Sequence, residues 1–145
     1  MQAPKRELEL DYSLSEIKQK IDAIIEASVG SYLLRDKNEV FHTYRIAAVN
    51  GMLSGIMSIT LKNSGENKTL FVTEIAPAAG AKVESATLGR LQDEFLNILG
   101  KALSGEEITR DLVKKNKAGC MGIVVTLILG AILLLMALNA SKEVF

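Results

Sequence analysis

The sequence has no tryptophan, one cysteine (Cys120) and one histidine (His42). A single cysteine permits no internal disulfide, and one cysteine with one histidine cannot build the usual zinc-ligand sets. Three tyrosines and four phenylalanines are too few for a base-stacking or carbohydrate-binding platform made of aromatic rings. Disulfide scaffolds and zinc fingers are therefore excluded, and we expect neither a metal nor another cofactor.

An excess of charge of one sign is also missing. Lys plus Arg total 17 and Asp plus Glu total 17, so no global field attracts the chain to nucleic acid. The nucleophile elbow G-x-S-x-G, the P-loop, the dinucleotide fingerprint and the H-E-x-x-H zinc motif do not occur. We therefore expect no nucleic-acid partner and no enzymatic activity.

One long hydrophobic run is present near the C-terminal end of the sequence. Residues 118–141 form a stretch of 24 positions without a charged side chain. A helix of about 20 apolar residues crosses the roughly 30 Å hydrocarbon core of a bilayer. The run predicts one transmembrane helix over 118–138, followed by a short tail over 139–145, and makes the lipid bilayer the first expected partner.

Basic residues near this predicted span indicate its orientation. Five precede the span and one follows it: Lys101, Arg110, Lys114, Lys115 and Lys117 against Lys142. Basic flanks stay on the cytoplasmic side, so the N-terminal part is expected in the cytoplasm. The prediction is a single-pass, tail-anchored protein of the cell membrane.

Small residues recur at every fourth position of the predicted span, at Ala118, Gly122, Thr126 and Gly130. Such a stripe lets two helix backbones approach closely in lipid, which predicts a homodimer through the transmembrane helix. The alternative is that small residues are simply common in membrane helices. Cys120, at the border of the span, fits either reversible palmitoylation or an inert cysteine.

The part before the span is expected to form one domain over 1–104, joined by a basic juxtamembrane helix or linker over 105–117. Alternating polarity predicts a strand over 7–12 with Leu8, Leu10 and Tyr12 on its buried side. Helical spacing predicts helices over 14–29 and 84–103. Ser13 with Glu16, and Ser104 with Glu107, are typical of capping boxes at helix starts, and Gly30 is expected to end the first helix.

Asn50-Gly51 predicts a two-residue hairpin loop, since both positions tolerate positive φ. Opposite residues then sum to 101, so His42 faces Ile59, Tyr44 faces Met57 and Val40 faces Leu61 on the apolar side. A third strand over 69–76, after a polar loop over 63–68, is expected to place Glu74 opposite Met57. A brief strand over 31–35 and a turn over 36–38 are expected before this hairpin.

These elements predict an α+β fold: a two-layer β-α-β(3-4)-α domain with an antiparallel sheet, followed by one C-terminal transmembrane helix. The element order resembles a shortened helix-grip or TBP-like arrangement. Order alone implies no function.

The predicted register places His42, Tyr44 and Glu74 together on the apolar sheet face under the helices. A few polar groups in an apolar setting are typical of small-molecule sites, so these residues are a candidate ligand-binding site. The alternative is that they are core polar groups satisfied by one another. The predicted function is a membrane-tethered, non-catalytic module that binds an apolar ligand or lipid. A membrane-anchored protein-interaction or scaffold protein is the alternative.

Overall fold

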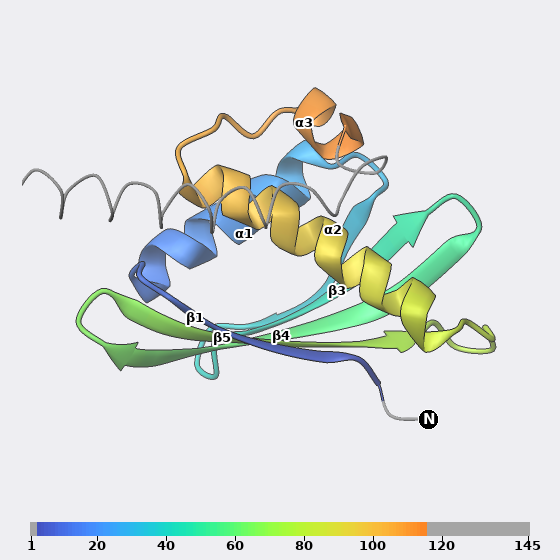
Figure 1. Ribbon diagram of the computed structural model, residues 1–145, viewed down its shortest axis with the longest axis horizontal. Coiled ribbons are helices and arrows are strands. Elements are labelled where there is room, and N and C mark those ends of the chain that lie inside the picture. The colour runs from blue at the N-terminus through green and yellow to red at the C-terminus, as the bar shows by residue number, and fades with distance from the viewer. Residues whose placement is uncertain (1–2, 116–145) are drawn as a thin grey trace, which may run out of the picture.

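The computed structural model describes residues 3–115, which form a five-stranded antiparallel sheet with helices on one face (Figure 1). The elements in chain order are β1 (Lys5–Leu10), α1 (Leu14–Ala27), β2 (Tyr32–Asn38), β3 (Thr43–Asn50), β4 (Leu53–Gly65), β5 (Lys68–Pro77), α2 (Ser85–Leu103) and α3 (Arg110–Lys115). The strands lie in the order β1-β5-β4-β3-β2, so β1 and β2 are the two edges. The predicted α+β fold with an antiparallel sheet is confirmed.

The predicted transmembrane helix lies outside the described residues, together with Ala118, Cys120, Gly122, Thr126 and Gly130. Among residues 3–115, no helix has the length and apolar character needed to cross a bilayer.

Helix α1 begins at the predicted capping box. The Ser13 hydroxyl accepts from the Glu16 amide at 3.2 Å, and the Glu16 carboxylate accepts from the Ser13 amide at 3.1 Å. The helix ends at Ala27, before the predicted end, because the backbone of Ser28 leaves the helical conformation, with ψ +82°; the buried Ser28 hydroxyl donates to the Ile25 carbonyl at 3.1 Å. Its inward face is made of isoleucines without solvent-accessible surface: Ile17, Ile21 and Ile24.

Helix α2 agrees with the predicted helix over 84–103 to within one residue. All six positions whose spacing predicted it are buried: Leu88, Leu91, Phe95, Ile98, Leu99 and Ala102. The Phe95 ring meets the Tyr32 ring of β2 edge to face, with 5.2 Å between centroids. Helix α2 thus connects β2 at one edge of the sheet with the strands near the other edge, since it also packs on β5.

The β3–β4 hairpin has a different register from the predicted one. The turn consists of Gly51 and Met52, with φ +64° at Gly51, and Asn50 stays in the strand opposite Leu53. Met52 has no positive φ, so the turn fits the type II′ geometry, in which the first central residue is glycine. Opposite residues sum to 103, as in Tyr44 opposite Ile59. The predicted pairing was wrong, but this slide of two positions leaves every side chain on its predicted face.

The register of the β4–β5 hairpin differs from the predicted one by one position, and this difference changes which side chains face the helices. Its turn contains only Glu66 and Asn67, with φ +52° at Asn67, and a β-bulge lies between Asn63 and Gly65. The predicted six-residue loop is therefore wrong. Opposite residues sum to 132 rather than 131, and a slip of one position turns every β5 side chain to the other face. Consequently, the helix-covered face of β5 carries Phe71, Thr73 and Ile75.

Three shorter predictions also need correction. Residues 36–38 are the end of strand β2 rather than a turn, and the turn lies over 39–42. Ser104 does not start a helix: its hydroxyl donates to the Lys101 carbonyl and ends α2. The following helix begins at Arg110, where the Thr109 hydroxyl accepts from the Leu112 amide at 3.2 Å. Within strand β1, Leu8 is 40% exposed because β1 is an edge strand.

Candidate functional site

The three residues of the predicted ligand site do not come together. Tyr44 lies on β3 with its side chain buried under the helices, as predicted. His42 precedes β3, in the turn, with φ +52° and a half-buried side chain. Glu74 is exposed on the uncovered face opposite Ser58, because of the one-position slip in β5. The prediction that Glu74 faces the helices is therefore wrong, and the three-residue site is not formed.

The layer between the sheet and the helices is filled with side chains. Tyr44, Ile59 and Thr73 lie in one row across β3, β4 and β5, with exposed fractions of 0–1%. Above this row, Gln92 of α2 donates through Nε2 to the Thr73 carbonyl at 3.0 Å. Thr73 Oγ1 and Gln92 Oε1 are buried and form no hydrogen bond within the described part of the chain. A ligand in this layer would require these side chains to move.

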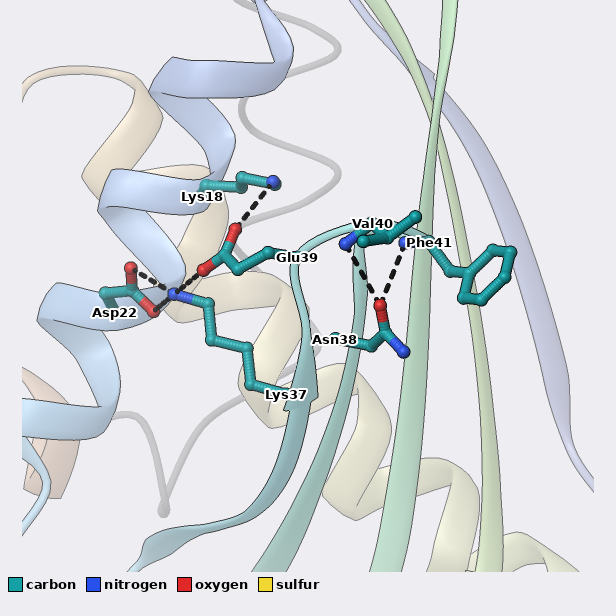
Figure 2. A network of polar contacts seen from close by, with 7 residues as sticks. All are labelled: Lys18, Asp22, Lys37, Asn38, Glu39, Val40 and Phe41. Carbon is teal, nitrogen blue, oxygen red and sulfur yellow. Dashed lines mark hydrogen bonds and ion pairs between the residues drawn. The ribbon is translucent and has the colours of Figure 1, made fainter.

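A group of ion pairs joins the end of β2 to α1 (Figure 2). Lys37 Nζ lies 2.8 Å from Glu39 Oε1 and 3.2 Å from Asp22 Oδ2, and Lys18 Nζ lies 3.1 Å from Glu39 Oε2. The hydrogen bonds from Lys37 and Lys18 lower the pKa of Glu39, and the hydrogen bond to Glu39 is the main reason that the pKa of Lys37 is raised. Burial raises the pKa of Tyr44, beside this group, to about 12. We call Lys18, Asp22, Lys37 and Glu39 the α1–β2 ion-pair cluster.

The ion-pair cluster makes stability depend on pH. The lowered pKa means that the ionised Glu39 carboxylate stabilises the fold. This contribution is fully present at pH values above 4.5, the ordinary pKa of the group, and it is lost as the pH falls through the folded-state pKa. We therefore expect Glu39→Gln to reduce the free energy of unfolding at neutral pH. We expect the difference from the unmodified chain to shrink as the pH falls below 4.5, and to vanish only below the lowered folded-state pKa, where the carboxylate is protonated in both states. Urea unfolding of the full chain in detergent measures this.

The exposed glutamate Glu26 of α1 offers a matched control for the change in net charge, through Glu26→Gln. A Glu39→Gln effect that stays the same between neutral and acidic pH would contradict the role assigned to the ionised Glu39 carboxylate.

The turn over 39–42 presents two apolar side chains to solvent. Val40 is 78% and Phe41 is 71% exposed. The side chain of Asn38 holds both residues, since its Oδ1 accepts from the Val40 amide at 3.0 Å and from the Phe41 amide at 3.1 Å (Figure 2). The expectation that Val40 faces Leu61 on the apolar side is wrong, because Val40 lies in the turn. We call Val40 and Phe41 the β2–β3 tip.

Strand β2 next to this tip is an open edge of the sheet. Leu33 and Leu34 are each 44% exposed, on opposite sides of the strand. The other edge, β1, carries charged residues at Lys5, Arg6, Glu7 and Glu9, which discourage pairing with another chain. Strand β2 carries three charged residues, Arg35, Asp36 and Lys37, against four on the shorter β1, and it leads directly into the β2–β3 tip.

The chain is similar to known proteins in structure and not in sequence. No family model matches this chain, and no curated protein matches it. Among solved structures, the chain is similar to a START superfamily protein from Mycobacterium smegmatis, at 14% identity and a TM-score of 0.40, over 71% of this chain and 94% of that one. At this level of similarity, nothing of that protein's function is carried over to this chain. Among the described residues, no group of His, Cys, Asp and Glu side chains could hold a metal ion.

Proposed function

We propose that this chain is a membrane-tethered, non-catalytic module that binds a protein partner through the β2–β3 tip. The tether is the charge-free run over 118–138, and the folded domain before it supplies the binding surface. The observation that carries the proposal is the exposure of Val40 and Phe41 on a turn whose backbone is held by Asn38.

A held turn is suited to binding because little conformational freedom remains to be lost on association. Asn38 fixes the amides of the tip, and the α1–β2 ion-pair cluster fixes the preceding residue, Glu39, against α1. Aromatic side chains that fill a pocket on the partner contribute a large share of binding energy at protein interfaces. Phe41 is therefore the expected anchor, with Val40 beside it.

The open edge of β2 extends this surface. An extended segment of a partner can add to an exposed strand by backbone hydrogen bonds, with side chains supplying specificity. Leu33 and Leu34 are the apolar side chains along that edge. A partner that takes Phe41 into a pocket is thus positioned to pair with β2.

Phe41→Ala is expected to weaken partner binding by the full chain in its native membranes by at least about tenfold. Met52→Ala is the matched control, because Met52 is fully exposed on the turn at the other end of β3. The measurement is chemical crosslinking in intact membranes, followed by identification of the proteins joined to each variant. A protein that crosslinks to the unmodified chain and to Met52→Ala, but at least about tenfold less to Phe41→Ala, supports the proposal; tenfold corresponds to about 1.4 kcal/mol.

A second variant tests the turn rather than the ring. Asn38→Ala keeps Phe41 but removes the acceptor for both tip amides, so binding is expected to weaken without being lost. Equal crosslinking of Phe41→Ala and the unmodified chain would reject the β2–β3 tip as the binding surface.

Binding of an apolar ligand between the layers is a second candidate function. It is favoured by buried polar atoms that form no hydrogen bond within the described part of the chain, among them Tyr44 Oη, Thr73 Oγ1 and Gln92 Oε1, because such atoms commonly face a water or a ligand. The same purified chain distinguishes the two functions. A small apolar molecule released on denaturation, together with unchanged crosslinking of Phe41→Ala, would favour ligand binding over the protein-interaction proposal.

A further inference from the structure

Helix α3 is a fixed part of the domain. Its residue Val113 is 2% exposed and belongs to the hydrophobic core, and α3 contacts α1. Thr109 caps the helix start, and Ile108 just before it packs against the core. The orientation of α3 therefore sets the orientation of the whole domain.

Very little chain separates α3 from the predicted membrane span. Helix α3 extends to Lys115, and the predicted span begins at Ala118, which leaves residues 116–117 between them. Three residue steps of fully extended chain cover at most about 10 Å. The end of α3 consequently has to lie at, or within one headgroup layer of, the bilayer surface.

The α1–β2 turn lies beside α3. Figure 1 shows α3 next to the C-terminal end of α1, where the chain turns into β2, in agreement with the contact between α1 and α3. Within this turn, Val29 is 69% exposed. Buried serines fix the turn on both sides, since Ser28 Oγ donates to the Ile25 and Tyr32 carbonyls and the Ser31 carbonyl accepts from the Val49 amide at 2.8 Å. Val29 is thus an apolar side chain held outward near the point where the chain meets the membrane.

We propose that α3 and the α1–β2 turn form the membrane-facing surface of the domain, with the Val29 side chain in the interfacial layer of the lipid. The proposal rests on the membrane tether of the proposed function. The sequence of α3 is basic, with Arg110, Lys114 and Lys115 against Asp111 alone, which favours anionic lipid headgroups over other partners. Apolar and basic residues together are typical of protein surfaces that lie on a bilayer.

This orientation points the β2–β3 tip away from the membrane. In Figure 1, α3 lies above the helices, whereas the β2–β3 turn lies at the lower margin of the sheet, beneath them. The surface proposed for a protein partner would then face the aqueous compartment rather than the lipid.

The test uses the full chain with Cys120→Ser, reconstituted in phosphatidylcholine vesicles with and without phosphatidylglycerol. Val29→Cys and Phe41→Cys are each labelled with an environment-sensitive fluorophore; both native side chains are mostly exposed, so both variants are expected to fold. Lipids that carry a spin label near the headgroup serve as the quencher. We expect the Val29 label to lose fluorescence and to shift to shorter wavelength, and the Phe41 label to do neither.

Flotation of the vesicles separates the two ways in which the test can fail. If the chain does not float, the tether itself is wrong, and the membrane-facing surface is rejected with it. If the chain floats but the Val29 label behaves like the Phe41 label, the tether stands and the membrane-facing surface is overturned. Quenching only in vesicles that contain phosphatidylglycerol supports the proposal and assigns the contact to the basic residues of α3.

Discussion

Phe95→Ala is expected to lower the free energy of unfolding by about 3–5 kcal/mol, the usual result of deleting a buried aromatic ring. Phe95 has no solvent-accessible surface, and its ring packs edge to face on Tyr32 at 5.2 Å between centroids. Removal of the ring leaves a cavity beneath α2 and deletes a contact between α2 and the edge strand β2. Phe95 belongs to the hydrophobic core cluster, whose members are all buried, so the site has little freedom to collapse.

The chain contains a matched control for this substitution. Phe41→Ala removes the same ring from a side chain that is 71% exposed, so its effect on stability is expected to be within about 0.5 kcal/mol. Urea unfolding of the full chain in detergent, followed by circular dichroism, compares the two variants. Equal losses of stability would contradict the assignment of Phe95 to the core and of Phe41 to the surface.

Gly55→Val is expected to destabilise the domain by about 3 kcal/mol through overpacking. Gly55 lies on β4 directly under α2, where an added Cβ would be 3.0 Å from Ile75 Cδ1 and 3.1 Å from Leu88 Cδ2. Both neighbours are themselves buried, so they cannot move into solvent to make room. The branched valine side chain would push α2 away from the sheet.

Gly89→Ala on α2 is the corresponding control and should have the opposite sign. An added Cβ there meets only Arg6 Nη2, at an ordinary contact distance of 3.6 Å, and alanine favours the helix over glycine by up to about 1 kcal/mol. The two variants are compared by the urea midpoint of the full chain. A Gly55→Val chain as stable as the unmodified one would show that α2 does not approach β4 as closely as described.

The helices and the general architecture could be predicted because they depend on local signals. The spacing of buried residues in α2 and the Ser13 capping box are both readable within one stretch of sequence, and the structure agrees with both. The face of each β3 and β4 side chain was also predicted correctly, although the turn is Gly51-Met52. A register error of two positions does not change which face of the sheet a side chain lies on, since side chains alternate with a period of two.

The prediction of the three-residue site was wrong because it depended on the β4–β5 turn, whose geometry cannot be read from the sequence. A polar stretch over 63–68 contains no mark that distinguishes a six-residue loop from a two-residue turn with a bulge. The difference of one residue moved Glu74 to the uncovered face and brought Thr73 inside. The β2–β3 tip was missed for a related reason: Val40 continues an alternating apolar pattern, and only the Asn38 side chain, bonding to two later amides, marks the start of the turn.

The place of β1 in the sheet has a consequence for synthesis. Strand β1 is made first, yet its partner is β5, and the paired residues are 59 to 69 positions apart in the sequence. The β3–β4–β5 meander has only short loops to close, so it is expected to form before β1 pairs with β5. Until β5 leaves the ribosome, β1 has no partner, and its alternating charges at Lys5, Glu7 and Glu9 keep that unpaired segment from adhering to other nascent chains.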